Sequence, residues 1–516
     1  MAQLSGLDSL FINMEMRGLP MHISSFSLYD PGTASGNTVS FEEIKKTYET
    51  AVLQHVPTFR AVLHEVPLGL DQPYWVEDED FNIDLHIHRM GLPHPGDWSA
   101  LLEVLATMHS EPLCREKPLW EAWVIENLDG VESFPKGCFG VFLKVHHALM
   151  DGRTGLKIFT SLHALGAREA PIALANAEGA KNHDNHFEGN QSYRKPSTLS
   201  MLGRSASNNA GRTFGIANLA STKLPQAWSR IRKGLGTDEL KTIGPRGKIC
   251  FNDVTSQRRV IDRIRIPIAT VRAIRSTSSG CTLNDVAMTI VGGAMQRYLL
   301  AMDVLPEASL IAAVPIDVRC KADASKAGNM LSIMSVSLAS DVGDSLARLE
   351  QVHIESSYSK KYSHILGNEI VDRVLNNIYP ALLSWAMPSF IKSSLMSKLP
   401  CICNTVITNV PGTSAPLYLA GAKLVESFGM GPLIPNVSLF HTITSTGDAI
   451  SISFVSCPEA MTRPALYKQC LVESYQDLVE RTDAQAVVTP IKGVKLEDLE
   501  RMPLVDPNPP SRVANT

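Results

Sequence analysis

The sequence predicts an α/β protein with two domains, and three observations carry this prediction. The chain has 516 residues, of which 44% are hydrophobic and 19% charged, so it can bury a large core. Helical and strand patterns alternate through residues 1–165 and resume at 260. Between these stretches the composition shifts towards Ala, Asn, Ser, Gly, Lys and Arg. The predicted divisions are an N-terminal domain at 1–167, a partly disordered linker at 168–250, a C-terminal domain at 251–488 and a loose tail at 489–516.

The first domain shows local signals for each kind of element. Ser40 and Glu43 have the spacing of a capping box, which predicts a helix through Val52. Alternation predicts a half-buried strand at 84–88, with His86 and His88 on one face. Such a pair could bind a metal, but we favour an ordinary exposed strand. A further strand is expected at 142–145, followed by a helix to about residue 165.

The second domain continues the alternation. A helix is expected at 283–300, begun by Thr282 or Asn284, and a buried strand at 310–318 is expected to end at Arg319. Other strands are expected at 260–266, 332–338, 405–410, 437–444 and 449–455.

Charge and cysteine usage exclude several classes of protein. The 48 Lys and Arg residues against 52 Asp and Glu give a net charge of −4, without the basic excess of a nucleic-acid binder. The nine cysteines form no C-x-x-C pair, which is typical of reduced thiols in a cytosolic protein. The N-terminus shows no secretory signal, and no stretch is long and apolar enough to span a membrane. We therefore expect a cytoplasmic protein that binds no nucleic acid.

The most apolar long stretch, 378–396, leaves two interpretations open. Pro380, Pro388 and Lys392 interrupt it, so it could be a buried helix with a proline break. It could instead be an interfacial segment that touches a lipid surface. The residues behind the second interpretation are Leu382, Leu383, Trp385, Met387, Phe390 and Ile391, beside Lys392 and Lys398.

The strongest chemical signal follows the strand expected at 142–145. His146 and His147 are followed four residues later by Asp151 and Gly152. Adjacent side chains on an extended segment point to opposite faces, so one histidine should enter a cleft while the other packs or forms a hydrogen bond. A metal site or a purely structural pair are the alternatives. Because the chain has no G-x-S-x-G elbow, Walker A loop or complete dinucleotide fingerprint, a histidine base without a covalent nucleophile is favoured.

These residues resemble the bacterial wax ester synthase / acyl-CoA:diacylglycerol acyltransferases, which belong to the chloramphenicol acetyltransferase-like superfamily. Residues 146–152 match the HHxxxDG motif of that family, which condensation domains of peptide synthetases share. The other matching segments, in order, are 4–8 with 20–22, Pro118-Leu119-Trp120, Asn284-Asp285, 314–319, Gly328-Asn329 and 409–412. The resemblance covers about residues 4 to 460. Residues 428–436 match the family only loosely, which leaves the acceptor specificity open.

The resemblance implies a fold and an activity. The fold would be two chloramphenicol acetyltransferase-like α/β domains that face each other across a central tunnel. The enzyme would be an O-acyltransferase that moves a long-chain fatty acyl group from acyl-CoA to diacylglycerol, to a long-chain fatty alcohol, or to both. Acyl-CoA is then a substrate, and neither a cofactor nor a metal is expected. Apolar substrates imply peripheral association with a membrane or a lipid-droplet surface.

The resemblance also assigns roles to residues. His147 would be the general base, with a pKa near 7, and would later protonate the departing thiolate. His146 would support its geometry. Asp151, before Gly152, would have a structural role and pair with an arginine of the second domain, for which Arg319 is the candidate.

Asn284 and Asp285 are the candidates for supporting the site or stabilising the oxyanion.

Three alternative functions stay open. The chain could be a condensation-type enzyme, an acyltransferase of the same superfamily with another acceptor, or a non-catalytic lipid-surface protein.

Overall fold

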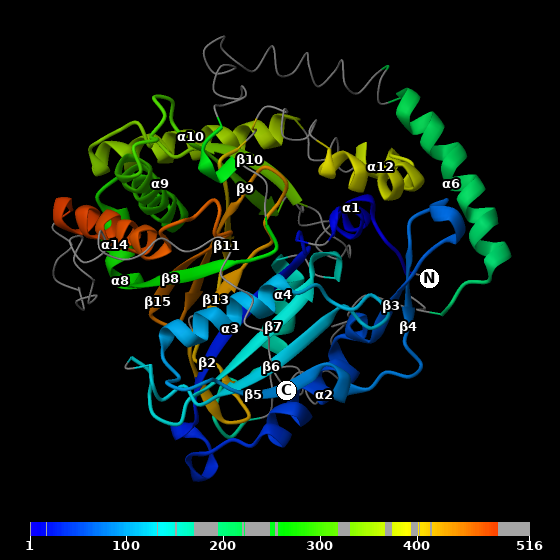
Figure 1. The fold of residues 1–516 in the computed structure, drawn as a ribbon, viewed down its shortest axis with the longest axis horizontal. Helices are drawn as coiled ribbons and strands as arrows, with labels where there is room; N and C mark the ends of the chain where they lie inside the picture. Colours follow the sequence, from blue (N-terminus) through cyan, green and yellow to red (C-terminus); the bar gives the residue numbers. More distant parts are fainter. Residues whose placement is uncertain are drawn as a thin grey trace.

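The computed structural model describes most of the chain between residues 2 and 482 (Figure 1). The residues outside this description are 1, 17, 132, 150–151, 170–193, 219–220, 222–247, 253–255, 318–330, 367–373, 394–400, 402, 413–414 and 483–516.

The first half of the chain builds a six-stranded mixed sheet in the order β12-β13-β2-β7-β6-β5. Its own strands are β2 (His22–Asp30), β5 (Ile87–Gly91), β6 (Trp120–Glu126) and β7 (Phe139–His146). A small sheet lies beside it, formed by β1 (Ala2–Gln3), β3 (Ala61–His64) and β4 (Tyr74–Glu77). The helices of this half are α1 (Gly6–Met14), α2 (Phe41–His55), α3 (Trp98–Ser110), α4 (Gly152–Ser161) and α6 (Thr198–Asn218).

Strand β7 lies inside this sheet, between β2 and β6, and every one of its residues is buried. Its side chains alternate between two cores. Phe142 joins a core that extends into the second half of the molecule, whereas Val141 and Val145 join the core of the first half. Both faces are covered, and the strand is apolar apart from the buried Lys144 and His146. It therefore provides a rigid support for the residues that follow it.

The second half forms another six-stranded sheet, in the order β10-β9-β11-β14-β15-β8. Its strands are β8 (Val260–Pro267), β9 (Ile311–Asp317), β10 (Leu331–Ser337), β11 (Thr405–Val410), β14 (Leu439–Thr446) and β15 (Ala449–Ser456). Its helices are α8 (Ile268–Ser276), α9 (Leu283–Ala301), α10 (Ser345–Leu366), α12 (Pro380–Lys392) and α14 (Pro464–Arg481). In Figure 1, α9, α10 and α14 lie together beside this sheet. Helix α9 is buried along most of its length, in the core formed by these helices and the sheet.

Two strands from the second half of the chain complete the first sheet. Strand β13 (Ala422–Met430) pairs antiparallel with β2, and the short β12 (Tyr418–Leu419) pairs with β13. Phe428 of β13 contacts Phe26 of β2, with ring centroids 5.5 Å apart. The two halves thus share one sheet. Residues 418–430 belong to the predicted second domain, so the two predicted domains are not separate sheets in space.

The prediction of a strand at 84–88 is wrong for its first residues. Residues Ile83–Leu85 form a 3₁₀ turn, and the strand begins at Ile87. Asn82 accepts the backbone N–H of Asp84 through its side chain, a local cap that competes with the extended conformation. His86 therefore does not share a strand face with His88. Its ring is buried, stacks on Trp120 and shares a hydrogen bond with the Trp120 carbonyl oxygen.

The segment predicted as a linker, 168–250, contains a helix of 21 residues, α6. The polar composition misled the prediction, because α6 buries only a narrow side formed by Met201, Ser205 and Arg212. The Arg212 guanidinium forms an ion pair of 2.5 Å with Asp71, and both side chains are almost fully buried. This pair fixes the helix to the first half of the molecule.

The apolar segment at 378–396 contains α12, with Pro388 inside the helix. Leu383 is 3% exposed, whereas Leu382 and Trp385 are 59% and 70% exposed. The interpretation as a fully buried helix is therefore wrong. Among the described residues, no helix is long and apolar enough to cross a membrane.

Candidate active site

The two histidines of the HHxxxDG motif lie where β7 ends. His146 is the last residue of the strand, and His147 begins the 3₁₀ turn His147–Leu149. The backbone N–H of His146 donates to the Leu119 carbonyl oxygen at 2.9 Å, and that of His147 donates to the Met21 carbonyl oxygen at 2.9 Å. The Pro118-Leu119-Trp120 segment thus holds His146 through the Leu119 carbonyl oxygen, and Met21 holds His147.

His146 is a buried, neutral residue. Its Nδ1 accepts the backbone N–H of Ala148 at 3.1 Å, so the neutral ring carries its proton on Nε2. Nε2 lies 3.6 Å from Glu15 Oε1. Burial, together with the nearby Arg115 and His147, lowers the pKa of His146 to about 3. These contacts suit a supporting residue, because the unprotonated nitrogen of this neutral ring is already occupied by the Ala148 N–H.

His147, in the 3₁₀ turn that follows the strand, has other contacts than His146. Its ring stacks on that of Phe11 from α1, with centroids 4.0 Å apart and planes inclined by 20°. Burial lowers the pKa of His147 to about 4, and the backbone carbonyl of the residue opposes this shift. The protein around the ring thus disfavours its charged form, and the pKa near 7 expected of the base in the reaction stays a prediction. At pH 7 the imidazole is neutral and ready to accept a proton.

The remaining part of the motif is only partly described. Gly152 is the first residue of α4, so the motif connects a strand end with a helix start. Asp151 and Arg319 lie outside the described residues. The ion pair expected between them stays a prediction.

Asn284 and Asp285 lie in the first turn of α9, in the second half of the molecule. Asp285 closes a capping box with Thr282, whose backbone N–H donates to Asp285 Oδ2 at 2.8 Å. The same carboxylate accepts the Ser356 hydroxyl at 2.6 Å and His353 Nδ1 at 3.0 Å. These bonds connect α9 to α10, so Asp285 acts as a structural acceptor and offers no donor to an oxyanion.

Asn284 is placed differently. Its Nδ2 lies 3.8 Å from the sulfur of Met288, and its Oδ1 is buried without a hydrogen-bond partner among the described residues. An amide that spends its donor on a weak acceptor could still turn towards a substrate. Its role as oxyanion donor stays a prediction.

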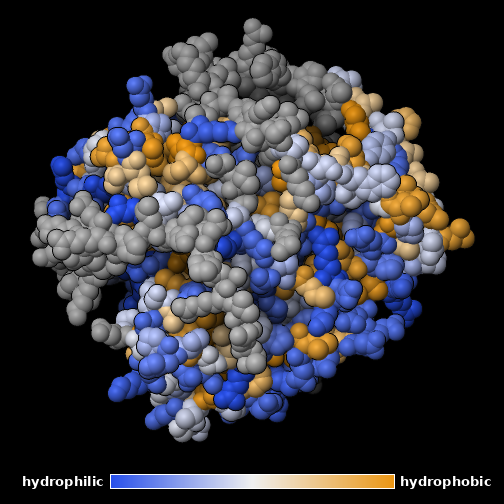
Figure 2. Space-filling view, in the orientation of Figure 1, coloured by the Kyte–Doolittle hydropathy of each residue, from blue (hydrophilic) through white to orange (hydrophobic). Residues whose placement is uncertain are grey.

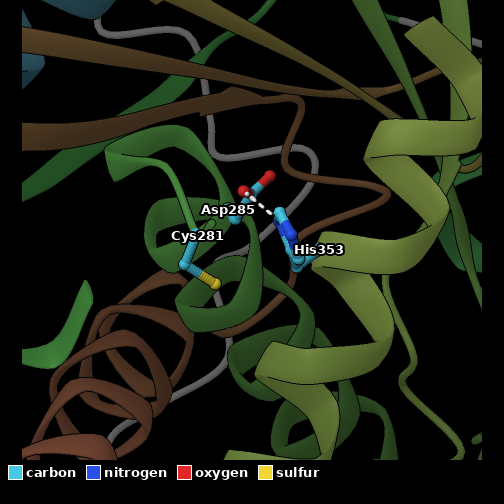
Figure 3. A group of neighbouring side chains, drawn as sticks. All are labelled: Cys281, Asp285 and His353. Carbon is cyan, nitrogen blue, oxygen red and sulfur yellow. Dashed lines mark hydrogen bonds and ion pairs between the residues drawn. The ribbon is translucent and has the colours of Figure 1, made fainter. Parts of the chain in front are cut away.

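Cys281, Asp285 and His353 could hold a metal ion by residue type, since one potential ligand atom from each lies within 4.8 Å of the others. Figure 3 shows His353 directed at the Asp285 carboxylate, with the Cys281 sulfur to one side. The Asp285 oxygens already accept three donors. The helix cap and its connection to α10 therefore account for this group, and we assign no ion to it.

Sequence reasoning missed a second pair of buried histidines beside the first. His22 lies opposite His146 in the β2–β7 register, and its Nε2 shares a hydrogen bond of 2.9 Å with the His109 carbonyl oxygen. His109 in turn contacts the Ser24 hydroxyl and the Gly431 carbonyl oxygen. Burial lowers the pKa of both rings, that of His109 to about 3. The Pro20-Met21-His22 segment was visible in the sequence, but its pairing with β7 was not.

Comparisons with known proteins agree with this architecture. Residues 4–287 match the model of the wax ester synthase/diacylglycerol acyltransferase catalytic domain, and residues 327–479 match the WS/DGAT C-terminal domain. A Mycobacterium tuberculosis H37Rv protein named as a diacylglycerol O-acyltransferase is 28% identical over 490 residues, which cover 94% of this chain and 91% of that protein. A second such protein from the same strain is 29% identical over 461 residues, covering 88% and 94%.

Solved structures show the same fold. The wax ester synthase/diacylglycerol acyltransferase from Marinobacter aquaeolei VT8 superposes with a TM-score of 0.65 at 24% identity, over 94% of this chain and all of that one. The first condensation domain of the CDA synthetase gives 0.56 at 14% identity, over 98% and 99%. The expected chloramphenicol acetyltransferase-like fold is thereby confirmed. The two family models together match most of the sequence, and the chain therefore belongs to the wax ester synthase/diacylglycerol acyltransferase family of acyltransferase enzymes.

Proposed function

We propose that this acyltransferase moves a long-chain acyl group directly from acyl-CoA to the hydroxyl of diacylglycerol or a long-chain alcohol, with His147 as the general base. The observation that supports this role is the position of His147, a neutral imidazole held by its backbone at the end of a buried strand. A rigid base of this kind needs no cofactor and no covalent intermediate.

The proposed step balances as a single acyl transfer. The acceptor oxygen forms a bond to the thioester carbonyl carbon while its proton passes to the His147 ring. The tetrahedral oxyanion then collapses, the carbon–sulfur bond breaks, and the proton passes from the ring to the sulfur to give free CoA. A positioned base contributes roughly 10² to 10⁴ to the rate of such a reaction.

The test compares two single variants of the purified protein. Labelled palmitoyl-CoA is incubated with hexadecanol or with diacylglycerol, and ester formation is measured. His147→Ala should lower turnover by at least about 10². His146→Ala should lower it less, because the Nδ1 of His146 is already bonded to the Ala148 N–H and its Nε2 lies beside Glu15. If a folded His147→Ala protein turns over at the wild-type rate, the mechanism is wrong.

We further propose that α6 and α12 form a surface that attaches the enzyme to lipid. The two helices lie close together, since the Thr213 and Tyr379 hydroxyls are 2.7 Å apart. Neither helix contains an acidic residue. The exposed large apolar side chains of the two helices are Leu199, Leu202, Phe214, Ile216, Leu382 and Trp385. Hydrophobic side chains gather over these helices on the right of Figure 2.

The proposed acceptor substrate favours a lipid surface, rather than a protein, as the partner of these exposed side chains. Diacylglycerol and long-chain alcohols are apolar and accumulate in membranes and lipid droplets. An apolar surface free of carboxylates binds an anionic lipid interface without charge repulsion. Arg204 on α6 is exposed, and its positive charge adds attraction to the anionic lipid surface.

The attachment is tested by co-sedimentation with phosphatidylcholine vesicles that contain phosphatidylglycerol and diacylglycerol. The double variant Leu382→Ser/Trp385→Ser should leave most of the protein unbound, because two exposed apolar anchors are lost. Leu85→Ser is the matched control, since Leu85 is also exposed but belongs to the 3₁₀ turn far along the chain. Equal binding of the double variant and the wild type would refute the proposal.

A further inference from the structure

Helix α1 and the residue that ends it contact both histidines. Phe11 stacks on the His147 ring at 4.0 Å. Glu15, the C-cap of the helix, places its Oε1 at 3.6 Å from His146 Nε2. Neither residue belongs to the HHxxxDG motif, from which both are more than 100 residues away in sequence. A single short helix therefore reaches the side chain of each histidine.

The Glu15 carboxylate is built into this position. Its side chain is 6% exposed, and Oε2 accepts two donors of Arg115, Nε and Nη2, each at 3.2 Å. Arg115 also donates to the Ile12 carbonyl oxygen at 2.6 Å, so the same guanidinium holds the last turn of α1. A planar guanidinium that bonds two acceptors fixes their relative geometry. Glu15 is thus immobilised on the side away from the histidines.

The other carboxylate oxygen connects Glu15 with the backbone of His147. Oε1 accepts the backbone N–H of Met21 at 3.3 Å, and the carbonyl oxygen of Met21 accepts the backbone N–H of His147 at 2.9 Å. Met21 is fully buried. Any displacement of Glu15 would therefore be passed to the His147 backbone through one residue.

We propose that Phe11 and Glu15 are positioning residues for the histidine pair, with Phe11 setting the plane of the His147 ring and Glu15 setting the backbone that carries it. This inference rests on the proposed role of His147 as the base.

The stacked ring of Phe11 has a second consequence for the reaction. When His147 takes the acceptor proton it becomes an imidazolium, and the face of an aromatic ring attracts a cation. At 4.0 Å and nearly parallel, the Phe11 ring stabilises this charged form more than the neutral one. An aliphatic side chain of similar size would fill the space but would supply neither a flat face nor this attraction.

The decisive experiment measures kcat and KM for palmitoyl-CoA separately in the full-length enzyme. Phe11→Leu should lower kcat about tenfold, the effect of losing one aromatic contact with a cation, while KM changes less than about twofold. Phe11→Tyr keeps the aromatic face and should recover most of the wild-type kcat. Asn13→Ala is the matched control on α1, because the Asn13 side chain bonds only the Ser9 carbonyl oxygen of its own helix among the described residues.

Glu15 is tested by a second pair of variants. Glu15→Gln keeps an oxygen acceptor for Met21 and should retain more kcat than Glu15→Ala, which removes it. Thermal unfolding is measured for each variant, so that loss of fold is separated from loss of positioning. If Glu15→Ala does not fold, Glu15→Gln and Phe11→Leu still decide the question.

The outcomes separate this inference from the proposed function. An inactive His147→Ala protein together with an unchanged kcat in Phe11→Leu would overturn the positioning role alone. Equal losses in Phe11→Leu and Phe11→Tyr would overturn the role of the aromatic face. Wild-type turnover in His147→Ala would instead remove the proposed base and with it the basis of this inference.

Discussion

Arg263 and Glu426 should be strongly coupled in stability, because they form a buried bridge between strands of the two sheets. Arg263 Nη2 on β8 donates to Glu426 Oε2 on β13 at 2.8 Å, and its Nε lies 2.6 Å from Oε1. The two side chains are 15% and 6% exposed. The guanidinium also lies 4.4 Å from the centre of the Trp98 ring on α3. Removing one partner of a buried pair costs roughly 3 to 5 kcal/mol, and we expect about 3 here because Arg263 keeps some exposure.

A double-mutant cycle measures this coupling directly. Glu426→Ala, Arg263→Ala and the double variant are unfolded in urea, and the free energy of unfolding is compared with that of the wild type. We expect a coupling energy of about 2 kcal/mol or more between the two positions. Glu126→Ala is the control, because its partner Arg89 is 58% exposed and such surface pairs contribute at most about 1 kcal/mol. Additive effects of Arg263→Ala and Glu426→Ala would refute the reasoning.

Two further predictions concern pH and the α9 cap. Burial lowers the pKa of His109 and His146 to about 3 and of His163 to about 4. Between these pKa values and the ordinary value of about 6.5, each of these histidines is protonated in the unfolded chain but not in the folded protein. The free energy of unfolding should therefore fall by up to about 1.4 kcal/mol per pH unit per histidine as the pH drops through this range. Equal urea midpoints at pH 7 and pH 5.5 would contradict this. Asp285→Ala removes the acceptor of three hydrogen bonds and should cost about 3 kcal/mol by thermal unfolding, whereas Asn284→Ala should cost less than about 1.

Local signals in the sequence predicted much of the fold. The strand expected at 405–410 matches β11, and the capping box of Ser40 and Glu43 starts α2 as expected. The helix expected at 283–300 is α9, capped by Thr282. In each case neighbouring residues carry the information, through alternation or through a cap that closes within four residues.

Contacts between distant segments could not be predicted in this way. Nothing near Phe11 or Glu15 indicates that α1 reaches the histidines, because that contact depends on how α1 packs against the end of β7. The lowered pKa of His147 has the same origin, since burial by distant residues is absent from a local motif. The helix α6 was missed because only a narrow side of it is buried.

The pairing of β13 with β2 has a consequence for synthesis of the chain. The edge of β2 that receives β13 belongs to residues 24–30, whereas its partner belongs to residues 423–430. A ribosome adds about 5 to 20 residues per second, so the roughly 400 residues between them take on the order of 20 to 80 s. During that time the N-terminal sheet has an unpaired edge beside strands that are already made, and an unpaired edge is a site of misassembly. The sheet that carries His146 is thus completed only when β13 has been synthesised and has left the ribosome, long after the other strands of the first half have formed.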